Sequence, residues 1–134
     1  METLLGAGQI KPNTLNPISL AYIGDAVYEI LVREHLALSG DRPPEQLHKL
    51  AVNFVSAKAQ AGAIEKLIPI LTEEETTAFK RGRNAKVSHI PKGASPAHYH
   101  NATGFETLFG HLYLTGQTER MRELFKIICE GEKV

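Results

Sequence analysis

Two carboxylates lie within otherwise apolar helical stretches, and they are the side chains of this sequence best suited to chemistry. Residues 18–32 read ISLAYIGDAVYEILV and contain Asp25, and in residues 102–114, ATGFETLFGHLYL, Glu106 is the only formal charge. A helix that is apolar on nearly every side is normally buried. An ionised carboxylate there costs several kcal/mol unless a cation or hydrogen-bond donors compensate for it. We therefore expect Asp25 and Glu106 to share one buried acidic site whose natural counter-ion is a divalent metal.

Basic residues gather between positions 80 and 92, a stretch that contains no acid. Cations at a helix end and in a loop rich in proline and glycine can contact phosphates, and so position a nucleic acid without reading its sequence. Beside two acids and a metal, such a clamp completes the parts of a metal-dependent phosphodiesterase. An ordinary solvated surface, with cations that complement a helix dipole, is the open alternative. The cations of this stretch are Lys80, Arg81, Arg83, Lys86 and Lys92.

The histidines are a weaker basis for a metal site. His98 and His100 are two residues apart and cannot share a helix face. His89 lies upstream of them and His111 follows on the next predicted helix, but the single cysteine, Cys129, does not support a zinc site. We expect the paired histidines to contact RNA or solvent rather than zinc.

The elements that must position these residues are predicted to be helical almost throughout. Asn16 and Pro17 are an N-cap followed by a first-turn proline, and the helix that they begin extends to about Leu38. Thr72 and Glu75 bound a capping box that begins another helix. The fold class is all-α, with about six to seven helices. Further helices are expected from residues 41–45 to about 53, and over 54–68, 72–83, 97–115 and 118–130, with a loop at 84–96.

Length and composition limit the remaining possibilities. The 134 residues are expected to form one domain, 1–134, with 1–14 as a flexible N-terminal segment. Lys plus Arg and Asp plus Glu both number 15, so the chain lacks a global cationic footprint. No apolar run reaches the roughly 18–20 residues of a membrane span, and the N-terminus does not resemble a signal peptide. With one cysteine, the reducing cytoplasm is the expected location.

Two motifs carry a resemblance to a known family. Residues 21–29, AYIGDAVYE, resemble the signature helix of the ribonuclease III family, in which an acid follows Leu/Ile-Gly and precedes Ala-Val-x-Glu. Residues 102–114 resemble the second acidic helix of that family. The resemblance extends over about residues 15–128 and implies a ribonuclease III-type endonuclease domain. The chain has no C-terminal double-stranded-RNA-binding domain, and together with residues 47–49 and 80–86 this resembles the Mini-III branch, which consists of the catalytic domain alone.

The resemblance implies a Mg²⁺-dependent endoribonuclease, with Mn²⁺ able to substitute, that cleaves double-stranded RNA and leaves 5′-phosphate ends. Asp25 and Glu106 would be the catalytic residues and the metal ligands. Longer family members carry two more acids, at the positions of Ala21 and Thr103, so two of the four usual carboxylates are absent here. For Glu29, one turn after Asp25, two roles stay open: it orders outer-shell waters, or it pairs with a base from another helix.

The resemblance also implies partners. A homodimer would pair through the signature helix, and a double-stranded precursor of large-subunit ribosomal RNA is the expected substrate, which places the enzyme in ribosome biogenesis. Core packing is an equal alternative for the two tyrosines of that helix. The rival functions are a non-catalytic RNA-binding scaffold and a helical interaction module. The expected dimer residues are Tyr22, Ile23, Ala26 and Tyr28; the expected RNA contacts are His48, Lys49, Lys80, Arg81, Arg83, Asn84, Lys86 and Lys92.

Overall fold

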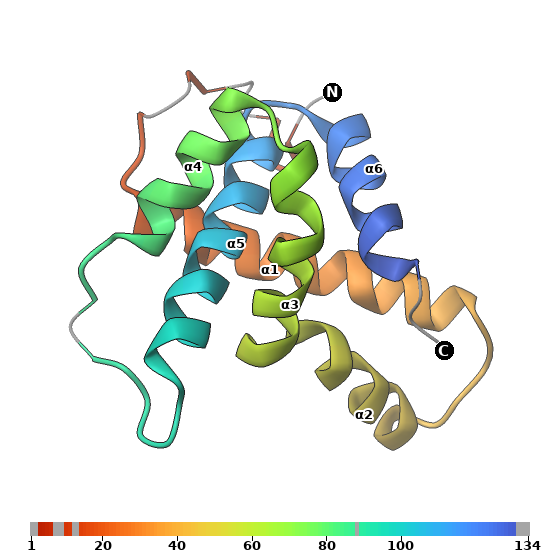
Figure 1. The fold of residues 1–134 in the computed structure, drawn as a ribbon. Helices are drawn as coiled ribbons and strands as arrows, with labels where there is room; N and C mark the ends of the chain where they lie inside the picture. The colour runs from red at the N-terminus through yellow and green to blue at the C-terminus, as the bar shows by residue number, and fades with distance from the viewer. Residues whose placement is uncertain (1–2, 7–9, 12–13, 88, 131–134) are drawn as a thin grey trace.

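The described part of the protein is helical, as predicted (Figure 1). The structure is a computed structural model, and it describes residues 3–6, 10–11, 14–87 and 89–130. These residues form six α-helices and one short 3₁₀ turn, which confirms the all-α fold class. The helices are α1 (Pro17–Leu38), α2 (Pro44–Val55), α3 (Ala57–Leu67), α4 (Glu73–Arg83), α5 (Pro96–Leu114) and α6 (Thr118–Cys129), and the 3₁₀ turn η1 is Ile68–Ile70.

The helix ends follow local capping chemistry. The side chain of Asn16 accepts a hydrogen bond from the backbone N–H of Ile18 at 2.8 Å, which starts α1. The capping box of α4 is reciprocal: Thr72 Oγ1 accepts from the Glu75 N–H at 3.1 Å, and Glu75 Oε1 accepts from the Thr72 N–H at 2.9 Å. The α2–α3 boundary lies later than predicted, because Ser56 is extended and caps α3.

Helix α5 is the central element, and α1, α3, α4 and α6 pack against it (Figure 1). Its residues Phe105, Leu108, Phe109 and Leu112 are all completely buried. Tyr28 of α1 enters this core and packs edge-on against Phe105, with ring centroids 4.7 Å apart. The apolar character of residues 102–114 is therefore explained by burial on every side.

Glycines let α5 approach two neighbouring helices at backbone distance. A Cβ atom on Gly24 would overlap the backbone oxygen of Glu106, and one on Gly110 would overlap that of Leu20. A Cβ on Gly82 of α4 would likewise overlap the Thr107 side chain. Any larger residue at Gly24 or Gly110 would push α1 away from α5. The α1–α5 crossing is thus fixed at the residue that precedes Asp25.

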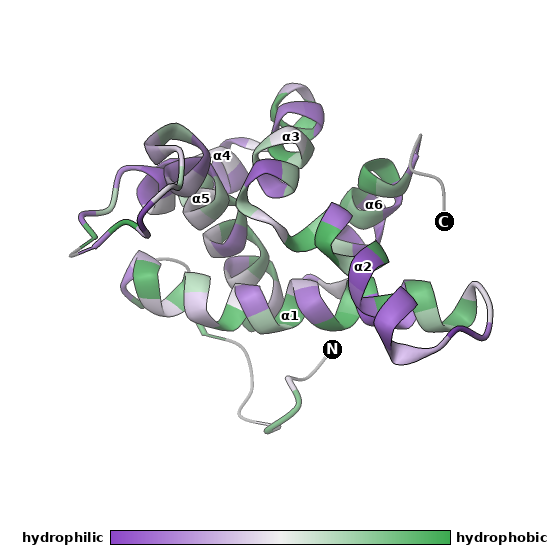
Figure 2. Ribbon diagram, turned by 90° about the horizontal axis from the view of Figure 1, so that it is seen from below, coloured by the Kyte–Doolittle hydropathy of each residue, from purple (hydrophilic) through white to green (hydrophobic). Residues whose placement is uncertain are grey.

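Helix α1 lies along one side of the molecule, with only the N-terminal segment beyond it (Figure 2). The described part of that segment contacts α5: the Leu4 N–H donates to the Tyr113 hydroxyl at 2.6 Å, and the Ile10 N–H donates to the Leu114 carbonyl at 3.0 Å. Residues 1–2, 7–9 and 12–13 lie outside the described residues, so the expected flexibility of residues 1–14 stays a prediction. Among the described residues, no helix has the length and apolar character needed to span a membrane.

Candidate active site

Asp25 and Glu106 come together where α1 crosses α5. The Gly24 contact with the backbone of Glu106 places Asp25 beside it, and the two carboxyl groups are joined by a side-chain hydrogen bond. The structure therefore brings together the two acids that the sequence placed in one site, although they are 81 residues apart.

The environments of the two acids differ, and one expectation about them is wrong. Glu106 is half-buried, but Asp25 is exposed. The apolar character of residues 18–32 suggested burial for both. Instead, the outer face of α1 has no neighbouring helix in this chain, so its apolar residues are exposed together with Asp25; Tyr22 is 81% and Ile30 62% exposed. Asp25 is consequently exposed on α1, while Glu106 is half-buried on α5.

The charge of Glu106 is poorly compensated. Burial raises the pKa of Glu106, and the hydrogen bond and negative charge of Asp25 raise it further, to about 8. A hydrogen bond from the Gln60 side chain acts in the opposite direction but does not offset these effects. No basic side chain contributes to the pKa shift of Glu106. A strongly shifted acid beside a second acid is typical of a functional site rather than of a structural ion pair.

Gln60 is a site residue that the sequence analysis missed. It lies on α3 and is only 2% exposed. Its side chain hydrogen-bonds to Glu106 and lines a depression beside that carboxyl group. A signal was present in the sequence: Gln60 shares its helix face with Ala63, Ile64 and Leu67, all of them buried, and a polar residue in such a core stripe needs a partner.

A small depression adjoins Glu106, with a volume of about 180 Å³. Thr103, at one of the positions where longer family members carry an acid, lines it, and its hydroxyl donates to the Tyr99 carbonyl at 3.0 Å. Among the described residues, no three His, Cys, Asp or Glu side chains converge on one point. The candidate metal ligands are therefore the two carboxylates of Asp25 and Glu106. These groups fit Mg²⁺, which prefers oxygen ligands, keeps several waters and often needs only one or two carboxylates.

Comparison with known proteins identifies the family. The family model described as Ribonuclease III domain matches residues 18–117, which include both carboxylates and Gln60. The chain belongs to the ribonuclease III family. It is an endoribonuclease of that family, as predicted.

Relatives of similar length support assignment of the chain to the Mini-III branch of this family. The chain is 50% identical over 120 residues to the Mini-ribonuclease 3 of Symbiobacterium thermophilum, covering 90% of this chain and 92% of that protein. It is 49% identical over 124 residues to the Mini-ribonuclease 3 of Brevibacillus brevis, with the same coverage. The crystal structure of a Fusobacterium nucleatum protein superposes with a TM-score of 0.81 at 29% identity, covering 90% of this chain and 97% of that one. The predicted resemblance to the Mini-III branch is confirmed.

The basic residues of this ribonuclease III domain are not equally available. Lys80, Lys86 and Lys92 are exposed. Arg81 donates to the Leu15 carbonyl at 3.2 Å. Arg83 lies with its guanidinium 5.4 Å from the centroid of the Phe79 ring and donates to Asn84 Oδ1 at 3.2 Å, so Asn84 is engaged as well. His48 and Lys49 are exposed on α2, which is separated from the end of α4 in both ribbon views. The structure therefore does not bring all the predicted RNA contacts into one cluster.

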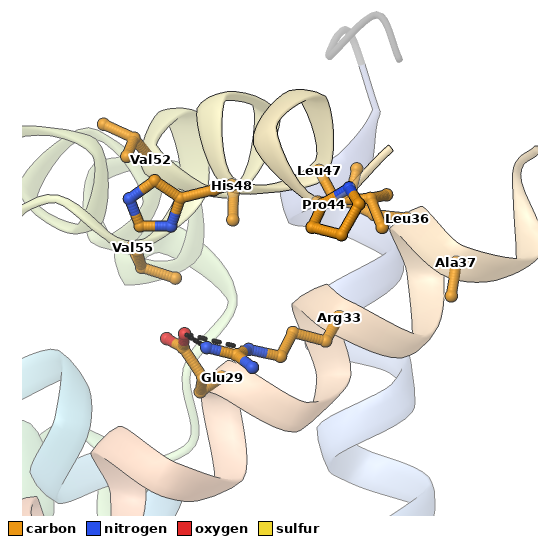
Figure 3. Close-up of a pocket in the computed structure, with 10 residues that line it drawn as sticks. Glu29, Arg33, Leu36, Ala37, Pro44, Leu47, His48, Val52 and Val55 are labelled. Atoms are coloured by element: carbon orange, nitrogen blue, oxygen red, sulfur yellow. Dashed lines mark hydrogen bonds and ion pairs between the residues drawn. The ribbon is translucent and has the colours of Figure 1, made fainter. Parts of the chain in front are cut away.

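Glu29 faces a groove between α1 and α2 (Figure 3). Glu29 Oε1 accepts from Arg33 Nη2 at 3.0 Å, and His48 lies across the groove on α2. The groove has a volume of about 420 Å³ and is otherwise walled by apolar side chains such as Leu47 and Val52. The base that pairs with Glu29 comes from its own helix, so the alternative of a partner on another helix is wrong. A role for Glu29 in ordering outer-shell waters stays a prediction.

The histidines give no zinc site among the described residues. His111 is 2% exposed, and its Nε2 lies 3.0 Å from Glu74 Oε1, which links α5 to α4. His98 and His100 are half-buried at the start of α5, and His89 is exposed in the preceding loop. No metal role follows for any of them.

The predicted dimer residues divide into two groups. Tyr22 and Ala26 are exposed on α1, and Ile23 is partly exposed. Tyr28 is only 1% exposed and lies inside the aromatic core, so the prediction of an interface role for Tyr28 is wrong, and core packing is the correct interpretation. Because α1 is apolar on nearly every side, its sequence pattern could not show which tyrosine faces inward.

Proposed function

We propose that this endoribonuclease cleaves double-stranded RNA at the Asp25–Glu106 pair and depends on Mg²⁺. One observation carries the proposal: two carboxyl groups meet, no basic side chain acts on Glu106, and the pKa of Glu106 is raised to about 8. A site with this excess of negative charge is prepared for a cation. Membership of the ribonuclease III family supports the same assignment.

The chain's own residues define how such a site works. A divalent cation bound there would lower the pKa of a bound water and neutralise charge on the phosphodiester. Asp25 and Glu106 would hold it through carboxylate oxygens after Glu106 gives up its proton. The glycine crossing fixes the distance between the two acids, so little reorganisation accompanies binding. Because Asp25 is exposed, a substrate as large as a duplex can reach the site.

A homodimer is part of the same proposal. The exposed apolar residues Ile18, Tyr22, Ala26 and Ile30 recur every four residues along α1 and form a stripe next to Asp25. A two-fold dimer through this stripe would set two active sites side by side, one for each strand of a duplex. Tyr22→Asp should then give a monomer that cuts duplex RNA poorly. A wild-type protein that sediments as a fully active monomer would rule out this arrangement.

The finer assignments concern the RNA. We assign phosphate contacts to the exposed cations Lys80, Lys86 and Lys92, because A-form RNA is gripped mainly through phosphates and 2′-hydroxyls. We propose a precursor of large-subunit ribosomal RNA as the substrate, by the family resemblance, and the cytoplasm as the place of action. His48 and Lys49 are further candidates for RNA contact.

Cleavage of a labelled RNA duplex tests the proposal directly. With Mg²⁺ or Mn²⁺ the expected products carry 5′-phosphate and 3′-hydroxyl ends, and with EDTA the duplex should stay intact. A single-stranded RNA of the same sequence is the control for specificity. Tight duplex binding without cleavage in any divalent metal would favour the non-catalytic scaffold instead. Absence of both binding and cleavage would favour a helical interaction module.

A further inference from the structure

The buried side chain of Gln60 calls for an explanation beyond packing. A primary amide that is 2% exposed loses its water partners and costs free energy unless protein groups replace them. The structure places it beside Glu106: both side chains line the depression of about 180 Å³, and the Gln60 amide acts on the Glu106 carboxyl group there. Among the described residues, the side chains of Gln60 and Asp25 both act on Glu106, and they come from α3 and α1 respectively. The acid is therefore held between two different helices.

The start of α3 fixes the position of Gln60. Ser56 caps this helix through its side chain, which accepts from the Ala59 N–H at 3.1 Å, and its carbonyl accepts from the Gln60 N–H at 2.9 Å. Helix α3 also packs along α5. Gln60 lies in the first turn of a capped and packed helix, so its side chain has a rigid base from which to reach Glu106.

The chemistry of the amide suits an orienting role. A glutamine NH₂ group can donate to one carboxylate oxygen and adds no charge to the site. The remaining lone pairs of that carboxylate then face away from Gln60, toward Asp25. An apolar residue at position 60 would leave the carboxyl group free to rotate, and a third acid there would add repulsion. Ala21 and Thr103 provide no carboxylate at the two positions where longer family members have one, so the orientation of Glu106 matters more here.

We propose that Gln60 is a positioning residue of this active site: its buried amide holds the Glu106 carboxylate so that its free oxygen atoms face Asp25 and a divalent cation bound between them. This inference rests on the proposed function, because it assumes that Asp25 and Glu106 are the metal ligands. Gln60 itself would contact neither the cation nor the RNA. Its role would be that of the outer groups that orient ligands in metal sites generally.

Metal binding without RNA provides the first test. Gln60→Met keeps the length and volume of the side chain and removes its hydrogen-bonding atoms. We expect the Kd for Mn²⁺, measured by electron paramagnetic resonance, to rise by about tenfold or more, as for other outer groups that orient ligands. The turnover of duplex RNA should fall by a similar factor with little change in KM. Gln46→Met, on an exposed position of α2, is the matched control and should equal the wild type.

A second measurement uses the unaltered protein and does not depend on the folding of a variant. In ¹H–¹⁵N spectra, the side-chain NH₂ resonances of Gln60 should shift as Mg²⁺ is added and saturate at the same concentration as metal binding. In Glu106→Gln this response should be lost. The side-chain resonances of Gln46 serve as the internal control and should not respond.

The outcomes separate the inference from the proposed function. If the wild type binds Mn²⁺ and cleaves RNA while folded Gln60→Met keeps a Kd within twofold of the wild type, the positioning role is overturned and the metal site stands. Resonances of Gln60 that ignore Mg²⁺ in an active wild type overturn it equally. If the wild type itself neither binds Mn²⁺ nor cleaves RNA, the proposed function fails and this inference fails with it.

Discussion

The pKa values of two glutamates of this chain, the buried Glu75 and the half-buried Glu106, shift in opposite directions. Burial alone would raise the pKa of Glu75, but hydrogen bonds from Arg120 and Thr72 and the charge of Arg120 outweigh burial and lower it. Arg120 donates from Nε to Oε2 at 2.8 Å and from Nη2 to Oε1 at 2.9 Å, a bidentate pair. Glu106 is half-buried, and the side chains that act on it are another acid and a neutral amide, so its pKa is raised to about 8.

The difference shows how the same residue type becomes structural in one place and functional in another. At Glu75 the protein supplies every compensating group itself, and the result is a lock between the start of α4 and α6. At Glu106 the compensation is incomplete, and the remaining charge must be balanced from outside by a proton or a metal ion. Burial alone therefore does not mark an active site; burial without an internal counter-charge does.

Removing the uncompensated acid should have the largest effect on activity. Glu106→Gln, or Asp25→Asn on the other side of the pair, should reduce duplex cleavage in Mg²⁺ by roughly 1,000-fold or more, since even outer groups that orient metal ligands contribute 10–100-fold. Single-turnover cleavage at saturating RNA measures the loss. Circular dichroism should show an unchanged helical fold. A near-normal rate in either variant would mean that the metal lies elsewhere.

Removing the cation that pairs with Glu75 should instead reduce the stability of the fold. Arg120→Met leaves Glu75 buried without its cation, and loss of one partner of such a pair costs about 3 kcal/mol. The melting temperature should fall by roughly 10 °C in a domain of this size. Cleavage per folded molecule at a temperature well below the transition should stay normal.

The matched control for Arg120→Met is Arg122→Met. Arg122 pairs with Glu119 on the exposed side of α6, where both side chains are more than half exposed. An exposed pair of this kind contributes less than about 1 kcal/mol. Equal melting temperatures for the two variants would show that the Glu75 site does not lock α4 to α6.

Several features of the fold and of the two glutamate sites could be predicted from sequence, because their signals lie within a few neighbouring residues. The capping box over residues 72–75 and the N-cap at Asn16 set the helix starts correctly. The pairing of Glu29 with Arg33 also has a local signal, the spacing of four residues along a helix, although the sequence analysis did not use it.

The remaining features depended on contacts between distant segments. Asp25 was expected to be buried because α1 is apolar all round, but no helix of the described residues covers the outer face of α1. The orientation of Tyr28 into the core and of Tyr22 outward was hidden for the same reason. Gln60 reaches Glu106 across 46 residues of sequence, and no pattern within α3 names its partner.

The two glutamates should also respond oppositely to pH. The pKa of Glu75 is lowered by folding, so its contribution to stability is present above its unfolded pKa near 4.5 and is lost as the pH falls further. The folded pKa of Glu106 is about 8 against 4.5 for the ordinary group. The folded state therefore holds an extra proton between these values, and this stabilisation is present below pH 4.5 and is lost as the pH rises through 8.

Denaturant unfolding in EDTA at pH values from 4 to 9 measures how the free energy of unfolding changes with pH, and so tests both effects. Relative to the wild type, Glu106→Gln should gain stability as the pH rises from 4.5 to 8, by a total on the order of a few kcal/mol. Glu75→Gln should instead be less stable than the wild type above pH 4.5, and this difference in the free energy of unfolding should shrink as the pH falls below 4.5. Mg²⁺ should restore wild-type stability at high pH, because metal binding takes the place of the proton. If the difference in the free energy of unfolding between the wild type and Glu106→Gln does not change with pH, the raised pKa of Glu106 is contradicted.

The smallest effects are expected at the exposed cations, which should leave both glutamates undisturbed. Replacing Lys86 and Lys92 by glutamine should change stability by less than about 0.5 kcal/mol, since both side chains are exposed. RNA binding, measured in Ca²⁺ to suppress cleavage, should weaken for every duplex sequence alike. Each lost phosphate contact should flatten the plot of log affinity against log salt by about 0.7–0.9 of a unit.

Raised KM with an unchanged single-turnover rate at saturating RNA would show that these lysines position the duplex without taking part in the chemistry. An unchanged salt slope would instead mark the loop as ordinary solvated surface, and the duplex would then approach the Asp25–Glu106 pair over α2, where His48 and Lys49 are exposed.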